Sequence, residues 1–74
     1  MWNSEEWNFF KQNLISMLKK TDCILVLADN TKIYCNLHNI DKDSSLTELW
    51  VNNTETSTPV LIDLNFLKKV IRLN

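Results

Sequence analysis

The chain has 74 residues, 45% of them apolar and 23% charged, a composition typical of one folded domain with a marginal core and not of a disordered segment. Eight Lys and Arg residues against nine Asp and Glu residues give a net charge of −1, so bulk electrostatics gives no reason to expect tight binding to phosphates. Glycine is absent, which excludes glycine-rich phosphate loops and a nucleophile elbow with flanking glycines.

The first ten residues, MWNSEEWNFF, contain two glutamates and no apolar run of the kind found in signal peptides or membrane spans. This favours an intracellular protein without membrane contact. Cys23 and Cys35 lack CxxC spacing and a histidine cluster. In a reducing compartment we expect them to be buried free thiols, with a disulfide or a metal site as the less favoured alternatives.

Residues 3–20 are predicted to form a helix. Asn3 has the side chain of an N-cap, and Glu6 stands three positions later, as in a capping box. Apolar residues then recur at three- and four-residue spacing and form one stripe, namely Trp7, Phe10, Leu14, Met17 and Leu18. Trp2 and Phe9 fall on a different face, so this aromatic pair is a candidate for a second surface that contacts a partner.

After residue 22 the pattern becomes extended. CILVLA is an apolar run of strand length, and Asp29-Asn30 behind it favours a tight hairpin. KIYCNLHNID alternates until Ile40 breaks the phase, which predicts a bulge between Leu37 and Ile40. LTELWV resumes strand propensity before the polar connection NNTETST.

The last two segments are PVLIDLN, with Pro59 as the first strand residue, and FLKKVIRL, which we assign to a strand rather than a helical turn because of Val70 and Ile71. One helix and five short strands predict a mainly β, strongly bent antiparallel barrel over residues 22–74, with the helix in residues 1–20. Residues 1–74 then make a single domain.

This order resembles the Sm-like fold, an SH3-like barrel. VLADNTKIYCNLHNID has the spacing of the first Sm signature, and LIDLNFLKKV occupies the register of the second. Asn30 and Cys35 stand where the family usually has glycines, Ser45 stands near the loop Asn that contacts a base, and Asp63-Leu64 replaces Arg-Gly. An ionised carboxylate repels phosphates, so Ser45, Asp63 and Leu64 are interpreted as lost RNA-loop positions, and RNA contact is expected to be indirect or weak.

The Sm-like resemblance implies that the fourth strand of one subunit pairs with the fifth strand of the next. The corresponding segments here are residues 60–64 and 67–72. They give the candidate protein interface, composed of Val60, Leu61, Ile62, Leu64, Phe66, Leu67, Val70, Ile71 and Arg72. For the side chains of Leu61, Phe66, Val70 and Ile71, the alternative is that each belongs to the core.

Residues 9–51, FFKQNLISMLKKTDCILVLADNTKIYCNLHNIDKDSSLTELWV, resemble the Gemin subunits of the survival-of-motor-neuron complex, the seventh and the sixth above all. The resemblance implies a heterodimer with another Sm-like protein, docked on a further scaffold subunit. It also implies assistance in loading Sm proteins onto small nuclear RNA, in the cytoplasm and nucleus.

Catalysis and cofactor binding are not expected, because the only histidine, His38, has no companions beyond Asp41 and Asp43 in a polar loop. Two alternatives to the scaffold prediction stay open. One is an Hfq-like homo-oligomeric RNA-binding ring, favoured by the basic residues Lys68, Lys69 and Arg72. The other is a small phage or plasmid interaction protein.

Overall fold

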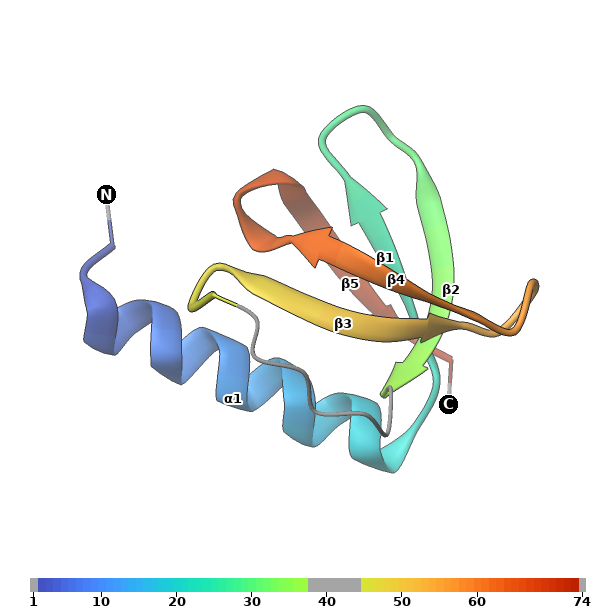
Figure 1. The fold of residues 1–74 in the computed structure, drawn as a ribbon, viewed down its shortest axis with the longest axis horizontal. Coiled ribbons are helices and arrows are strands. Elements are labelled where there is room, and N and C mark those ends of the chain that lie inside the picture. Colours follow the sequence, from blue (N-terminus) through green and yellow to red (C-terminus); the bar gives the residue numbers. More distant parts are fainter. Residues whose placement is uncertain (1, 38–44, 74) are drawn as a thin grey trace.

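The computed structural model describes residues 2–37 and 45–73, which form one helix and a five-stranded antiparallel sheet (Figure 1). The helix, α1, spans Ser4–Lys20, and a 3-10 turn, η1 (Leu64–Phe66), separates the last two strands. The strands are β1 (Cys23–Leu27), β2 (Lys32–Leu37), β3 (Glu48–Asn53), β4 (Thr58–Asp63) and β5 (Leu67–Arg72). The prediction of a mainly β chain with one helix followed by five strands is confirmed.

Helix α1 begins where the capping box was predicted. Asn3 Oδ1 accepts the Glu6 N–H at 2.9 Å, and Glu6 Oε1 accepts the Asn3 N–H at 3.4 Å. Leu14 and Leu18 are buried, and the other three residues of the predicted stripe pack against the core as partly buried side chains. The helix therefore binds the sheet through its apolar face.

The strand order is β4-β3-β2-β1-β5, so two strands that are consecutive in sequence lie at opposite ends of the sheet. Among the described residues no ladder joins β4 to β5, and the sheet is not closed; the prediction of a barrel was wrong on this point. A tight hairpin would have paired these strands. Instead η1 carries the chain across to β1, where the Ala28 N–H donates to Phe66 O at 2.7 Å.

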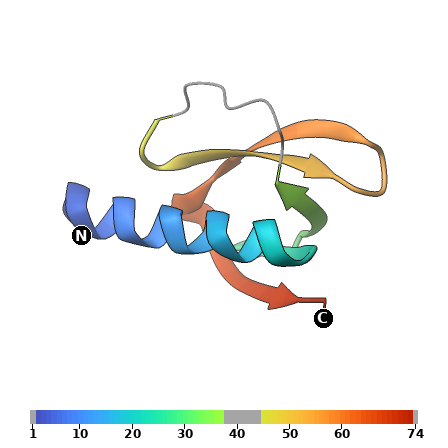
Figure 2. The ribbon, with the colours of Figure 1, turned by 90° about the horizontal axis from the view of Figure 1, so that it is seen from below.

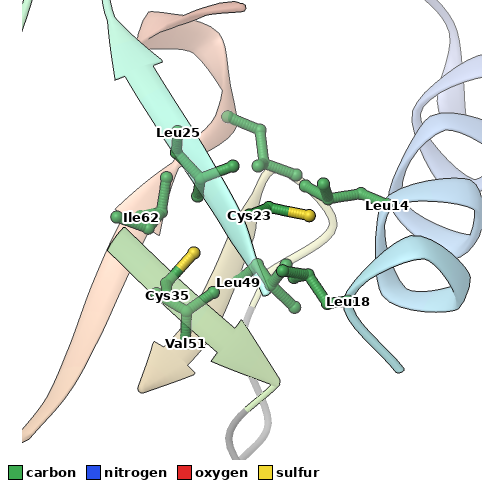
Figure 3. Close-up of a cluster of buried hydrophobic side chains, with 9 residues drawn as sticks. Leu14, Leu18, Cys23, Leu25, Cys35, Leu49, Val51 and Ile62 are labelled. Carbon is green, nitrogen blue, oxygen red and sulfur yellow. The ribbon is translucent and has the colours of Figure 1, made fainter. Parts of the chain in front are cut away.

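The open sheet curls around a single core. Figure 1 shows β3 and β4 running across the direction of β1 and β5, and Figure 2 shows α1 lying along the face toward the viewer. Leu25 of β1, Val51 of β3 and Ile62 of β4 meet in one cluster, although β2 and β3 separate β1 from β4 in the sheet (Figure 3). Such a cluster requires a strongly bent sheet.

Asn30 adopts the left-handed backbone predicted for the β1–β2 turn, with φ of 70°. Asp29 Oδ1 accepts the Thr31 N–H at 3.0 Å, and hydrogen bonds from the side chain and backbone of Thr31 lower the pKa of the Asp29 carboxyl. The bulge predicted between Leu37 and Ile40 lies outside the described residues. A bulge does occur in β5, where Lys69 pairs with Val26 and Leu67 with Leu27, which leaves Lys68 as the extra residue.

Two predicted strand boundaries were wrong. β3 runs on to Asn53, whose Oδ1 accepts the Glu55 N–H at 2.9 Å, so the connection NNTETST is reduced to residues 54–57. Pro59 is the second residue of β4, not the first. A proline is tolerated there because β4 has a neighbour on one side only.

Candidate functional site: the open edges of the sheet

The β4 edge (Thr58–Asp63) and the β5 edge (Leu67–Arg72) are the two places where strands of this sheet have one neighbour instead of two. They coincide with the predicted segments 60–64 and 67–72, except that Leu64 belongs to η1 and not to a strand. A strand with one open side presents unpaired backbone N–H and C=O groups that another strand can bind.

On the β4 edge, the direction of the backbone groups follows from one bond of the ladder. The Leu64 N–H donates to Thr47 O at 2.8 Å, and antiparallel ladders bond at every second residue. The backbone groups of Leu61 and Asp63 therefore point away from β3, toward the open side. Pro59 points the same way but offers only its carbonyl, because proline has no N–H.

The same counting applies to the β5 edge. The Leu73 N–H donates to Asp22 O at 3.1 Å, so Ile71 and Lys69 direct their backbone groups to β1. Val70 and Arg72 direct theirs to the open side. Both edges thus present alternating donors and acceptors that no strand within the described residues uses.

The side chains of the predicted interface divide into three groups. Ile62 and Leu64 are buried core residues, so their side chains do not reach the surface. A second group of side chains is partly buried, namely Val60, Leu67, Val70 and Ile71. Three side chains are exposed: Leu61 at 41%, Phe66 at 60%, and Arg72.

Leu61 lies directly across from Trp50 on the outer face of the β3–β4 pair. Trp50 is half-buried, and Pro59 belongs to the same face, two positions along β4. The outer face of the β4 edge therefore carries an apolar pair that the chain itself leaves largely uncovered.

The predicted lost RNA-loop positions come together at one corner of the sheet. Leu64 bonds to Thr47, two residues from Ser45, and Asp63 lies opposite Glu48 in the β3–β4 ladder. The Ser45 hydroxyl donates to Glu48 Oε1 at 2.9 Å, and Lys11 Nζ of the helix donates to the Ser45 carbonyl at 3.0 Å.

At this corner Asp63 is the N-cap of η1. Its Oδ1 accepts the Asn65 N–H at 2.9 Å and the Asn65 side-chain amide at 3.0 Å, which caps η1. Two carboxylates, those of Asp63 and Glu48, stand directly opposite one another in the ladder. A phosphate placed between these two side chains would be repelled by both carboxylates.

The basic residues of β5 do not form one continuous patch. Lys68 Nζ donates to Asn30 Oδ1 at 2.9 Å in the β1–β2 turn. Arg72 lines a shallow depression with Lys20 at the end of α1, whereas Lys69 pairs with Val26 and points to the opposite face of the sheet.

The structure gives different surroundings to Trp2 and Phe9. Trp2 precedes the helix, and its ring contacts those of Trp7 and Phe10 edge-on, with centroids 5.0 and 5.3 Å away. Phe9 lies on the solvent side of α1 and is 71% exposed. The three ring contacts of the aromatic cluster at the start of the helix do not involve Phe9.

Cys23 and Cys35 are buried free thiols, as predicted, and lie opposite one another on β1 and β2 within the core cluster (Figure 3). Burial raises the pKa of the Cys35 thiol to about 12 and also raises that of Cys23. Since the thiolate is the reactive form, neither has the features of a nucleophile.

Within residues 2–37 and 45–73, no group of His, Cys, Asp and Glu side chains could hold a metal ion. His38, Asp41 and Asp43 lie outside the described residues. In the same part of the chain, no helix has both the length and the apolar character needed to cross a membrane.

Comparison with known proteins gives no relative: no family model matches the chain, and neither the curated proteins nor the solved structures contain a match.

Replacing Asp63 with alanine is expected to lower the free energy of unfolding by about 1 kcal/mol, because the η1 N–H groups lose their acceptor. Asp63→Asn keeps an acceptor oxygen and should retain most of this stability. Urea unfolding of the three proteins measures the difference. Equal losses in both variants would contradict the capping role and assign the effect to the charge.

Proposed function

We propose that this chain is a non-catalytic scaffold subunit that works by pairing its sheet edges with strands of another Sm-like protein. The observation that carries the proposal is the strand order β4-β3-β2-β1-β5, which leaves the β4 and β5 edges open at opposite ends of a bent sheet. Backbone groups of Leu61 and Val70 face outward on these two edges. They suit recognition by strand addition, in which main-chain hydrogen bonds supply the affinity.

The resemblance to the Gemin subunits adds a setting to this proposal. In that setting the chain forms a heterodimer with a second Sm-like protein, docks on a further scaffold subunit and assists assembly of the Sm core on small nuclear RNA. The exposed ring of Phe9 on α1 is the candidate contact for that further subunit, and Trp2 flanks the same end of the helix.

The competing function, an Hfq-like ring that grips RNA directly, is less well supported. Such a ring needs a cation or donors at the turn between β4 and β5, where Asp63 is committed to η1 and faces Glu48. The basic side chains of β5 do not form one patch. Lys68 donates to Asn30 in the β1–β2 turn, and Lys69 and Arg72 lie on opposite faces of the sheet. The phage or plasmid alternative would use the same open edges for a different partner.

Co-expression with a tagged Sm-like protein from the same genome tests the proposal. The expected result is a stable complex of defined stoichiometry that survives high salt, since backbone pairing and apolar contacts resist screening. Tight binding of uridine-rich RNA by the chain alone, weakening steeply with salt, would favour the ring instead.

A further inference from the structure

We infer that the β4 edge pairs antiparallel with the β4 edge of a second copy of this chain, on a two-fold axis at Leu61. The inference names the occupant of one edge and so rests on the proposed edge-pairing function. It leaves the β5 edge for the other Sm-like protein.

The backbone of the β4 edge is suited to pairing with itself. Leu61 directs both its N–H and its C=O to the open side, so two copies of Leu61 placed opposite one another exchange both bonds of a hydrogen-bonded pair. At the next bonding positions on either side of the axis, the Asp63 N–H of each copy donates to the Pro59 carbonyl of the other. The missing N–H of Pro59 costs a bond at each end of the pairing but none at its centre.

The side chains on the outer face match in the same register. Leu61 is exposed and has Trp50 beside it on β3. Pairing on this axis sets the two Leu61 side chains next to one another with a Trp50 on either flank. A continuous apolar row across four strands results, and it removes exposed leucine surface from water.

The inner face matches as well. Val60 is half-buried at the rim of the core, and Ile62 next along that face is buried. In this register Val60 of one copy lies opposite Ile62 of the other. The cores of the two copies then continue into one another, which covers the half-buried rim.

Charge placement favours the β4 edge over the β5 edge for self-pairing. Each Asp63 would face a Pro59 and not the Asp63 of the other copy, so like charges stay at opposite ends of the paired strands. A β5 edge paired with itself on an axis at Val70 would place Arg72 of each copy opposite Lys68 of the other. Such self-repulsion leaves the β5 edge better suited to a strand that carries carboxylates.

The test is the concentration-dependent mass of the purified chain in sedimentation equilibrium, with Leu61→Lys and Leu61→Pro as interface variants. The wild type is expected to be a dimer. Leu61→Lys places two ammonium groups on the axis, and Leu61→Pro removes the central donors, which the monomer does not use. Each should weaken dimerisation by about a hundredfold or more. If Leu61→Pro fails to fold, the surface change Leu61→Lys decides the question.

Two further variants serve as control and as gain of function. Val70→Pro changes the β5 edge and one side chain beside the core but leaves the β4 edge intact, so its dimer should persist. Pro59→Thr supplies the missing N–H and should tighten the dimer by about tenfold, because each copy gains a hydrogen bond. A folded wild-type monomer, or a Leu61→Lys variant that still dimerises, would overturn the inference.

The outcomes separate this inference from the proposed function. A monomer that still binds an Sm-like partner through β5 would contradict self-pairing of the β4 edge and would still support the scaffold function. A dimer that depends on Leu61 but captures no Sm-like protein supports self-pairing and defeats the function.

Discussion

Replacement of Val70 by proline is expected to abolish pairing of the β5 edge with the Sm-like partner, weakening the complex by at least about a hundredfold. The Val70 N–H points to the open side of β5, so proline removes the donor that the proposed partner would bind. Its ring also occupies the space that the incoming strand needs. The β1–β5 ladder keeps its bonds, because Ile71 and Lys69 supply them. Affinity for the tagged partner, measured by surface plasmon resonance, gives the effect.

Val70→Ala is the matched control, since Val70 also packs against the core. Alanine loses the side chain but keeps the N–H, so it should lower stability while the complex still forms. If the proline and alanine variants bind the partner equally well, the β5 edge is not the binding edge.

Replacement of Leu25 by alanine is expected to lower the free energy of unfolding by about 2–5 kcal/mol. Leu25 is fully buried on β1, between β2 and β5, and it shares the core cluster with Val51 and Ile62. A domain of this length has a total stability on the order of 5–10 kcal/mol, so this one cavity removes a large share of it. Urea unfolding followed by tryptophan fluorescence measures the loss.

Phe9→Ala is the control for this measurement, because its side chain is mostly exposed and should change the stability by about 0.5 kcal/mol or less. A Leu25 variant as stable as the Phe9 variant would contradict a single core enclosed by the bent sheet.

Local signals in the sequence were sufficient for the helix and for the existence of the strands. Asn3 and Glu6 define the start of α1 through contacts three residues apart, and the stripe that contains Leu14 and Leu18 identifies its buried face. The Asp29-Asn30 turn was equally visible, because its left-handed residue is a local requirement.

Features that depend on distant parts of the chain were not predictable. Whether β4 meets β5 depends on Phe66 O bonding to Ala28, far away in sequence, and at this point the predicted barrel is a sheet that is not closed. The pairing of Asn52 with Pro59 extended β3 into a polar segment that composition assigns to a loop. Trp2 was assigned to a face with Phe9, but the helix begins after it and its ring packs on Trp7.

At the candidate site, the sequence predicted the two edge segments from resemblance but gave no sign of which residues face outward. That requires the ladder bonds at Thr47 and Asp22, which fix the alternation along β4 and β5. The role of Asp63 was interpreted as a loss of RNA contact. A signal for its capping role was present, since an Asp side chain commonly accepts the backbone N–H two residues further along the chain.

Light scattering of the chain, alone and co-expressed with an Sm-like partner, tests edge pairing most directly. The account predicts a small discrete assembly for the chain alone and a larger defined complex with the partner, which Val70→Pro prevents from forming. A chain that gains no mass with any Sm-like protein, or a stable homo-hexamer or homo-heptamer that binds uridine-rich RNA, would contradict it.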